Sequence, residues 1–343
     1  MKKIRVAING LGRIGRAFLK LAVEREEVEI VAVNDLADIN NLGYLIRHDT
    51  AYGAWNHRLT IEGNFLVVDE KTRIRFVSEP DLFKLPWREL AVDVVVESTG
   101  VFTSYEKAVP HMTAAGAKRV VISAPLKEDS PEGQHCSAIL MGINDNQMSS
   151  CSVTSNASCT TNAASPLMQI LHEAFGIEKA MLSTIHGYTS TQSLVDSPSK
   201  HDWRRGRAAA QNIIPSSTGA AVAVTKAITD LAGKFDGIAF RVPVITGSLA
   251  DVTILFSRDV QVEELNSVLR AAAKDSRWSD VFSVSDEPLV SSDIVGTLHA
   301  AIVDLSLTRV VGGNLAKVVS WYDNEMGYTN ALLLHVIKSG QTL

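Results

Sequence analysis

One cysteine lies in a short stretch whose composition could support covalent catalysis. Residues 155–162 read SNASCTTN, so six of the seven residues around Cys159 carry a hydroxyl or a side-chain amide. Residues 163–171 are typical of a helix, which would place the sulfur among free backbone N–H groups at a helix N-terminus. A buried structural cysteine is the commoner role for a free thiol. The polar neighbours favour a nucleophile here.

A histidine is available as the base that such a nucleophile needs. Residues 180–185 are predicted as a strand, and His186 follows directly. A histidine at a strand end is often only a hydrogen-bonded core residue, but a candidate nucleophile without another obvious base favours the catalytic role. An ion pair with His186, together with the helix terminus, is expected to lower the pKa of the Cys159 thiol. The two side chains must therefore touch.

Hydrogen-bond donors suited to phosphate follow His186 along the chain. The long polar segment 193–214 carries three arginines at its centre, and this length without a regular element is typical of a binding loop or of disorder. Residues 215–219 (PSSTG) and Arg241 add hydroxyl, N–H and guanidinium donors. Together these donors indicate a phosphate-binding site.

A dinucleotide-binding fingerprint opens the chain. A predicted strand at residues 3–9 runs into Gly10, Gly12 and Gly15, and a helical pattern follows. The first glycine permits a tight turn, the second lets the backbone approach a pyrophosphate, and the third allows close packing of helix on strand. The phosphate then meets the helix N-terminus. Such a triplet alone is a weak signal.

An acid at the expected distance strengthens the fingerprint. A second predicted strand, residues 28–33, leads to Asp35, twenty residues after Gly15, where the fingerprint places the residue that binds the ribose. Asp35 could instead cap the helix predicted after it. A carboxylate at the ribose would repel the 2′-phosphate of NADP, so NAD is the expected cofactor.

Later apolar runs predict further strands of a parallel sheet. Residues 92–96 suit a central strand covered on both faces, and residues 120–122 form a shorter run. Between the second and third predicted strands, residues 58–77 are predicted as a hairpin insertion. Ligands of such sheets bind beyond the carboxyl ends of the strands. The residues expected to converge there with Asp35 are Ser98, Gly100 and Ser123. The pattern alone is equally consistent with plain turn roles for the two serines.

Composition describes an ordinary two-domain globular protein. The chain has 343 residues, 46% of them hydrophobic, and a formal net charge of −5 with scattered Lys and Arg. A dedicated nucleic-acid site is therefore not expected. No apolar run is long enough to span a membrane, and a cytoplasmic location is expected. Three cysteines without framework spacing indicate free thiols, and no metal-site motif is present.

The sequence resembles the phosphorylating glyceraldehyde-3-phosphate dehydrogenase family essentially from end to end. The motifs that carry the resemblance are residues 7–16 (AINGLGRIGR), 97–103 (ESTGVFT), 155–162, the segment that begins at His186, and 320–325 (SWYDNE). The resemblance implies an α/β fold with a Rossmann NAD-binding domain at residues 1–158, completed by a C-terminal helix at 325–343. It implies an α+β catalytic domain with a mixed or antiparallel sheet at residues 159–324. Members are usually homotetramers, with the arginine-bearing segment near a subunit interface.

The resemblance also implies residue roles. Cys159 would be the nucleophile and His186 the base. The residues that would hold the substrate phosphate and inorganic phosphate are Ser158, Thr160, Thr189, Arg205, Thr218, Gly219 and Arg241. Those that would hold NAD are Arg13, Ile14, Asp35, Ser123 and Asn324, in addition to the glycines. The implied reaction is oxidation of glyceraldehyde 3-phosphate by NAD with inorganic phosphate, through a hemithioacetal and a thioester on Cys159.

This chain departs from the family pattern at three places. Many relatives carry a second cysteine where Ala163 stands, residues 78–81 read SEPD instead of an Arg-Asp-Pro run that often meets the adenine, and residues 244–248 read VITGS. Erythrose-4-phosphate dehydrogenase, which uses water in place of phosphate, is the nearest alternative function. A non-catalytic dinucleotide sensor or an RNA-binding protein is a remote one.

Overall fold

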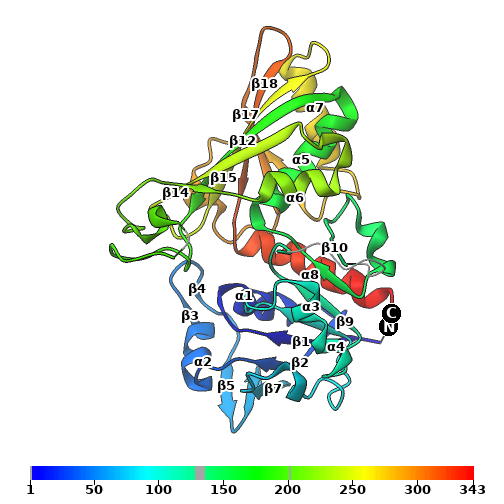
Figure 1. Cartoon of the computed structure of the whole chain (residues 1–343), viewed down its shortest axis with the longest axis vertical. Coiled ribbons are helices and arrows are strands. Elements are labelled where there is room, and N and C mark those ends of the chain that lie inside the picture. The colour runs from blue at the N-terminus through cyan, green and yellow to red at the C-terminus, as the bar shows by residue number, and fades with distance from the viewer. Residues whose placement is uncertain (1, 128–135, 201) are drawn as a thin grey trace. The chain divides into compact units, whose positions relative to one another are not determined.

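The chain divides into two compact units. A computed structural model describes residues 2–127, 136–200 and 202–343. The first unit comprises Met1–Ile139, Asn144–Ala157 and Leu332–Leu343, and the second comprises Leu140–Ile143 and Ser158–Ala331. The break before Ser158 lies next to the predicted domain boundary. The chain returns to the first unit at Leu332 instead of residue 325. Both units combine sheets with helices, so the predicted α/β class is confirmed (Figure 1).

The first unit is built on a nine-stranded sheet that is parallel except at one edge. Its order is β10-β11-β9-β8-β1-β2-β7-β6-β5. The strands are β1 (Ile4–Asn9), β2 (Val28–Asn34), β5 (Leu59–Glu62), β6 (Phe65–Val68), β7 (Thr72–Val77), β8 (Val94–Glu97), β9 (Arg119–Ile122), β10 (Cys136–Ala138) and β11 (Val153–Ser155). The predicted hairpin is confirmed as β5–β6–β7, and β7 also pairs in parallel with β2.

Helices and short elements complete the first unit. They are α1 (Arg13–Ala22), α2 (Ile39–Arg47), α3 (Tyr105–Ala108), α4 (Pro110–Thr113), the 3₁₀ turns η1 (Leu82–Lys84) and η2 (Asp145–Ser150), and the small ladder β3 (His48–Asp49) with β4 (Gly53–Ala54). Helix α1 buries Phe18 and Leu19 against the apolar face of β1 and β2. The last helix, α8 (Met326–Gln341), adds Leu332 and Val336 to the same core, because these residues share one face of the helix.

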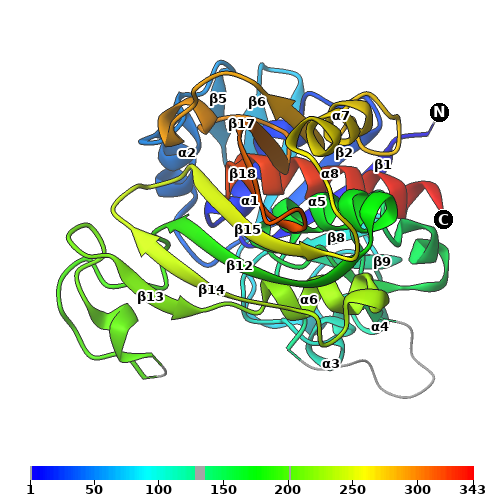
Figure 2. The ribbon, with the colours of Figure 1, turned by 90° about the horizontal axis from the view of Figure 1, so that it is seen from above.

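The second unit is built on a seven-stranded mixed sheet. Its order is β13-β14-β12-β15-β18-β17-β16, with parallel pairing only in β12–β14 and β16–β17. The strands are β12 (Ile177–Gly187), β13 (Ile214–Ser217), β14 (Phe235–Val242), β15 (Ser248–Phe256), β16 (Phe282–Ser285), β17 (Ala301–Val311) and β18 (Leu315–Tyr322). Figure 2 shows β12, β14 and β15 side by side.

Helices cover one face of this second sheet. They are α5 (Cys159–Phe175), α6 (Ala220–Ala227) and α7 (Val262–Ala272). The unit also contains the 3₁₀ turns η3 (Trp203–Gly206), η4 (Thr229–Leu231) and η5 (Ser291–Ile294). Helix α5 contacts both α6 and α7, and strands β12, β15, β17 and β18 as well. Its residues Leu167 and Leu171 are fully buried. Within the described part of the chain, no helix combines the length and apolar character needed to cross a membrane.

Candidate active site

A sharp turn between β11 and α5 places Cys159 at the first position of the helix. Ala157 adopts a left-handed backbone (φ 53°), a conformation that is uncommon for a residue with a side chain. Ser158 then caps the helix, because its Oγ accepts the backbone N–H of Thr161 at 3.0 Å. The sulfur of Cys159 therefore lies beside the first turn of a 17-residue helix, as the sequence predicts.

His186 stands at the end of β12 with its ring against this sulfur. The distance from Cys159 Sγ to His186 Nε2 is 3.3 Å. His186 Nδ1 lies 2.6 Å from the carbonyl oxygen of Gly187, and we assign the ring hydrogen to Nδ1 because a carbonyl can only accept. Nε2 then presents its lone pair to the sulfur. This is the arrangement of a nucleophile and its base.

Arg241 supplies a positive charge beside this pair. It faces His186 across the β12–β14 pairing, and its Nη1 donates to Gly187 O at 3.1 Å, the same carbonyl that accepts from His186 Nδ1. Because both nitrogens are then donors, the 2.9 Å approach of Nη1 to Nδ1 is a close contact of a charge with the ring and not a hydrogen bond. Burial, and then the Arg241 charge, lower the pKa of His186 to about 3. The imidazole is therefore neutral near pH 7 and able to accept a proton.

The pKa of the thiol runs against the sequence-based expectation. Burial raises the pKa of Cys159, and the opposing effects of Arg241 and Thr160 do not overcome it. A neutral His186 provides no positive charge to stabilise a thiolate, so the expected lowering by an ion pair is wrong for this state of the site.

A second arginine lies near the first. Arg205 donates from Nε to Ser216 Oγ at 3.2 Å and from Nη2 to Ser217 O at 3.3 Å. Its charge lowers the pKa values of both His186 and Arg241. Two guanidinium groups close enough to repel each other favour binding of an anion beside them, because the anion offsets that repulsion.

Two of the predicted anion-binding residues stand at the start of α6. Thr218 and Gly219 precede the helix, and Thr218 Oγ1 accepts the backbone N–H of Ala220 at 3.2 Å. Thr189 follows β12; its Oγ1 lies 3.0 Å from Thr191 Oγ1, and its N–H reaches Gln192 Oε1 at 3.4 Å. Among the predicted donors, Thr160 is different, because its hydroxyl is buried against the phenol oxygen of Tyr322 at 2.9 Å.

The glycine-rich turn of the first unit has the features that its spacing predicts. Gly10 has φ +98°, and a Cβ on Gly15 would lie 1.9 Å from Gly10 O, so neither position tolerates a side chain. A Cβ on Gly12 would meet open space among the described residues, and no described side chain caps α1. The start of α1 thus offers backbone N–H groups and room for a pyrophosphate.

Asp35 lies against this turn instead of capping a helix. Its Oδ2 accepts the backbone N–H of Leu11 at 2.7 Å, and its Oδ1 accepts that of Ala37 at 2.9 Å. Helix α2 begins at Ile39 and is capped by Asp38, so the helix-cap interpretation of Asp35 is wrong. The carboxylate stands where a ribose beside the glycine-rich turn would be within its reach.

The side chains of the neighbouring fingerprint residues Arg13 and Ile14 contact other parts of the protein. The Arg13 guanidinium pairs with Asp49 Oδ2 at 2.6 Å and lies 5.6 Å from the centre of the Tyr52 ring. Ile14 is half-buried and packs against the core. A pyrophosphate at the first turn of α1 would meet the N–H groups of both residues, while the Arg13 side chain is held by Asp49.

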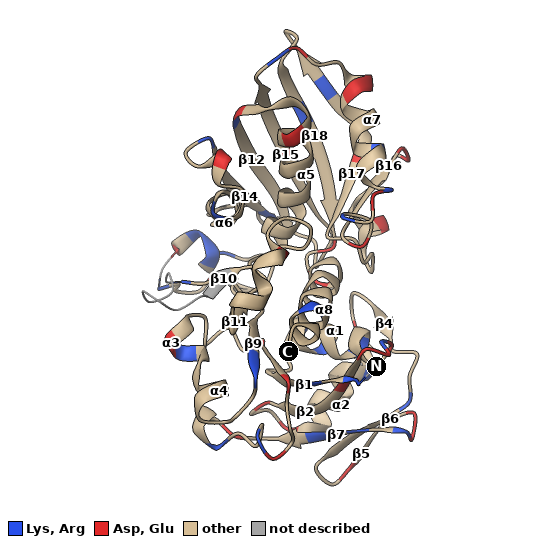
Figure 3. Ribbon diagram, turned by 90° about the vertical axis from the view of Figure 1, so that its right-hand side faces the viewer, with Lys and Arg blue, Asp and Glu red and all other residues tan. Residues whose placement is uncertain are grey.

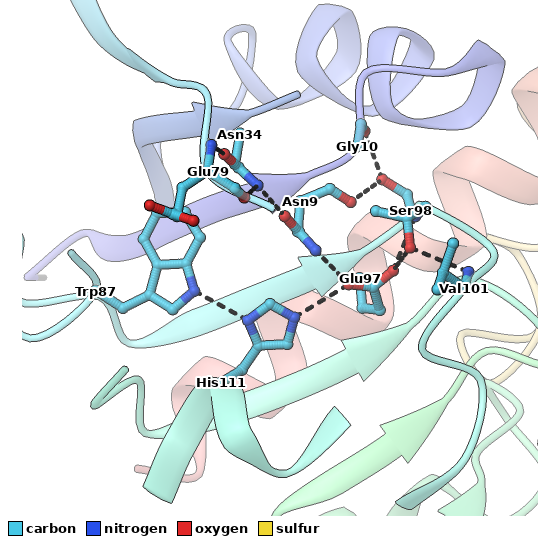
Figure 4. A network of polar contacts seen from close by, with 10 residues as sticks. Asn9, Gly10, Asn34, Glu79, Trp87, Glu97, Ser98, Val101 and His111 are labelled. Carbon is cyan, nitrogen blue, oxygen red and sulfur yellow. Dashed lines mark hydrogen bonds and ion pairs between the residues drawn. The ribbon is translucent and has the colours of Figure 1, made fainter. Parts of the chain in front are cut away.

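A buried polar network joins the carboxyl ends of β1, β2 and β8 (Figure 4). Glu97, at the end of β8, accepts Asn9 Nδ2 at 2.6 Å and contacts His111 Nε2 at 3.0 Å. Trp87 Nε1 donates to His111 Nδ1 at 3.0 Å, which leaves Nε2 to carry the hydrogen that Glu97 accepts. Asn34 Nδ2 donates to Asn9 Oδ1 at 2.7 Å. The strand ends that carry the fingerprint are thus fixed together.

Ser98 connects this network to the glycine-rich turn. Its Oγ lies 2.7 Å from Gly10 O and 3.1 Å from Asn9 O, so the hydroxyl hydrogen is engaged by the backbone (Figure 4). Gly100 has φ +74°, and Ser123 follows β9 with its N–H on Glu97 O at 2.9 Å. The structure therefore brings Ser98 and Ser123 to the edge predicted for the ligand, with Ser98 supporting the turn.

Asn324 belongs to the second unit and has a fixed amide orientation. Its Oδ1 accepts Ser248 Oγ at 2.8 Å. Thr246 Oγ1 lies 3.2 Å from the same oxygen, but its single hydrogen has the shorter contact, 2.8 Å, with Asp323 Oδ1. Ser248, the last residue of the VITGS segment, thus fixes the orientation of this amide. Nδ2 is left as the donor that Asn324 can offer to a ligand.

Family models match both parts of the chain. The NAD-binding domain of glyceraldehyde 3-phosphate dehydrogenase matches residues 4–105, and the C-terminal domain of the same enzyme matches residues 158–324. The glyceraldehyde-3-phosphate dehydrogenase of Thermotoga maritima is 46% identical over 332 residues, 96% of this chain and 97% of that protein. Those of Mycolicibacterium smegmatis and Borreliella burgdorferi are 45% and 44% identical, covering 99% and 96% of this chain and 99% and 98% of their own.

The chain belongs to the glyceraldehyde-3-phosphate dehydrogenase family. As a member of the glyceraldehyde-3-phosphate dehydrogenase family it is an NAD-dependent oxidoreductase that acts on an aldehyde group. Its N-terminal domain is the NAD-binding domain of that family. The open space at Gly12, the uncapped start of α1 and the position of Asp35 fit such a cofactor.

Several contacts near the candidate site are not predicted from the sequence alone. Tyr322 lies inside the SWYDNE motif, but the sequence does not reveal its contact with Thr160. Glu97 could have been suspected, because an acid at the end of an apolar strand is a candidate for a buried, hydrogen-bonded carboxylate. His111 carries no such signal, since its two partners are brought to it only by the fold.

Proposed function

We propose that this enzyme converts glyceraldehyde 3-phosphate, NAD and inorganic phosphate into 1,3-bisphosphoglycerate and NADH. The observation that carries the proposal is the 3.3 Å contact of Cys159 Sγ with a neutral His186, next to Arg241. A thiol with an adjacent base suits attack on an aldehyde carbon. Nearby guanidinium groups suit a phosphorylated substrate.

The chemistry begins with covalent attachment of the aldehyde. As Cys159 Sγ attacks the carbonyl carbon, His186 Nε2 takes the thiol proton, and the resulting imidazolium can donate to the developing oxyanion. The product is a hemithioacetal. His186 then removes the hydroxyl proton as the hydride leaves the same carbon. Bound NAD supplies the acceptor for that hydride, and a thioester on Cys159 remains.

The second stage transfers the acyl group to phosphate. Inorganic phosphate attacks the thioester carbon, the C–S bond breaks, and the thiolate is reprotonated through His186. We assign the two phosphate groups to the donors around Cys159: Ser158, Thr189, Arg205, Thr218, Gly219 and Arg241. Thr160 contacts the sulfur of Cys159 through its backbone N–H and Tyr322 through its hydroxyl, so we assign it to positioning of the nucleophile instead of to phosphate.

The assignment of NAD contacts follows the geometry of the first unit. The pyrophosphate would be held at the start of α1 by the N–H groups of Arg13 and Ile14, and the ribose by Asp35. A hollow of about 360 Å³ in the same unit is bordered by Pro80, Phe83 and Phe102. Its apolar walls would suit the adenine ring, which the SEPD segment otherwise leaves without an assigned contact. Asn324 would bind the nicotinamide amide through Nδ2.

An exposed apolar face supports assembly into a homotetramer. Met181, Ile238 and Leu315 are 58%, 47% and 42% exposed and lie on the side of the second sheet opposite α5 and α6. A hollow of about 690 Å³ borders on Met181 and Leu315 of this face, and its wall also includes Val222 of α6 and the charged side chains of Lys179, Lys234 and Asp236. Trp203, in the arginine-bearing segment, is 86% exposed. A surface of this kind is typical of a subunit interface.

Erythrose-4-phosphate dehydrogenase is the alternative that the same site could support. The pair of arginines with the start of α6 favours phosphate as the acceptor over water. We expect no dedicated nucleic-acid site, because basic and acidic residues are interspersed along the ribbon (Figure 3). We also propose a cytoplasmic location for the enzyme.

Turnover with and without phosphate tests this function. With glyceraldehyde 3-phosphate and NAD in phosphate-free buffer, NADH formation should stop after about one equivalent per active site and resume when phosphate is added, because the thioester waits for its acceptor. Stopped-flow absorbance of NADH measures both phases. Steady turnover without phosphate would instead assign the water-using reaction.

A further inference from the structure

Tyr322 links the helix that carries the nucleophile to the strand that carries the base. Its side chain lies at the end of β18 and is only 1% exposed. The phenol oxygen is 2.9 Å from Thr160 Oγ1, next to Cys159 on α5, and 2.7 Å from Thr184 Oγ1, two residues before His186 on β12. One oxygen thus contacts both elements that hold the reacting pair.

The donor and acceptor in each of these hydrogen bonds can be assigned by starting from Thr184. Thr184 Oγ1 donates to the backbone carbonyl of Leu249 on β15 at 3.2 Å, which uses its only hydrogen. It must therefore accept from the Tyr322 hydroxyl. Tyr322, having donated, accepts from Thr160. The chain of donors runs from Thr160 through Tyr322 and Thr184 to a backbone carbonyl.

The Tyr322 ring makes a further contact with the base. Its centroid lies 5.9 Å from that of the His186 ring, at an interplanar angle of 77°, which is an edge-to-face arrangement. His186 is therefore held on one side by Tyr322 and at Nδ1 by the carbonyl of Gly187. Rotation of the imidazole away from the sulfur would disturb both contacts.

We infer that Tyr322 is a positioning residue that fixes Cys159 Sγ against His186 Nε2 through its hydroxyl bonds to Thr160 and Thr184. The inference rests on the proposed roles of Cys159 and His186. Tyr322 does not touch the sulfur in this arrangement; it acts through the first turn of α5 and the end of β12. Small displacements of reacting groups are costly in rate, so this link should matter for the chemical steps more than for ligand binding.

The Tyr322→Phe variant tests this role, because it keeps the ring and removes both hydroxyl bonds. We expect kcat to fall by roughly ten- to a hundredfold while the KM values for NAD and phosphate stay within about twofold. The pH profile for iodoacetamide alkylation of Cys159 should shift as well, since contact with Nε2 is altered. Thr184→Val cannot accept a hydrogen bond from the phenol. It should therefore show the same fall in kcat with nearly unchanged KM values, and the same shift in the pH profile of alkylation.

Thr308→Val is the matched control. Its hydroxyl is equally buried in the second unit and donates to Asn266 Oδ1 at 2.8 Å, so the variant loses a buried hydrogen bond away from Tyr322. It should keep kcat and the alkylation profile of the wild type. Unchanged kcat and profile in Tyr322→Phe, or an equal loss in Thr308→Val, would overturn the positioning role. A wild-type enzyme that fails to oxidise the aldehyde would instead contradict the proposed function, and alkylation would still report on the link.

Discussion

At the scale of single residues, Asp35 combines two tasks in one carboxylate. Oδ2 holds the N–H of Leu11 in the glycine-rich turn, and the negative charge stands beside the expected position of the ribose. The first task needs only an acceptor. The second, discrimination against the 2′-phosphate of NADP, needs the charge.

Two substitutions separate these tasks. Asp35→Asn keeps an acceptor for Leu11 and removes the charge, so the ratio of kcat/KM for NAD to that for NADP should fall by roughly ten- to a hundredfold, the worth of one charged hydrogen bond. Asp35→Gly should lower the ratio similarly and also raise KM for both cofactors, because the turn loses its support. Steady-state kinetics with each cofactor measure the ratio, and wild-type preference for NADP would contradict the assigned role.

Residues that act locally could be predicted from the sequence, while those that act through distant contacts could not. Cys159 and the glycine-rich turn can be predicted from the sequence because their function depends on neighbours along the chain. The contact of the Thr160 hydroxyl with Tyr322 cannot be predicted in this way, since the two residues are 162 positions apart in the sequence. The raised pKa of the Cys159 thiol is not predicted from the sequence for the same reason, because burial of the sulfur, and burial and the Arg241 charge that keep His186 neutral, come from the fold.

At the scale of elements, α8 is fastened to the first unit by a buried histidine. His335 Nε2 accepts from Thr154 Oγ1 at 2.8 Å, and Nδ1 faces Asn156 Oδ1 at 3.2 Å, next to the turn that leads to Cys159. Burial lowers the pKa of His335 to about 3. The parallel strands are predictable from apolar runs, but this attachment of α8 is not, because it depends on side chains that lie 181 and 179 residues apart in the sequence.

The lowered pKa of His335 predicts an acid-dependent loss of stability. An unfolded histidine binds a proton below about pH 6.5, whereas folded His335 does so only near pH 3, so its contribution is present above pH 6.5 and declines as the pH falls towards 3. His335→Gln should be less stable than wild type at pH 8, and the gap should narrow at pH 5. Calorimetric Tm values test this, with exposed His48→Gln as control. A gap that widens on acidification would contradict it.

At the scale of the whole molecule, the exposed apolar face of the second sheet is expected to bind another copy. Met181→Asp introduces a charge on this face and should shift the native mass, measured by light scattering, from a tetramer to smaller species. Val290→Asp, at a residue that is 57% exposed but precedes η5, should leave the mass unchanged. A wild-type protein that is monomeric at micromolar concentration would contradict the assembly.

The central claim is that oxidation of the aldehyde leaves its acyl group on Cys159. It depends on the contact of Cys159 Sγ with His186 Nε2 in the second unit. The covalent species that the reaction must form is a thioester on Cys159. Cys159→Ser removes the sulfur and should lose nearly all oxidation while it keeps NAD affinity, because the cofactor contacts are untouched.

Mass spectrometry of the enzyme after one turnover tests the claim most directly. The protein is mixed with glyceraldehyde 3-phosphate and NAD in phosphate-free buffer, quenched in acid and digested. We expect a phosphoglyceroyl thioester on the peptide that contains Cys159. This adduct should disappear when phosphate is added before the quench, and it should not form in Cys159→Ser. NADH formation without an adduct, or an adduct on Cys151, would contradict it.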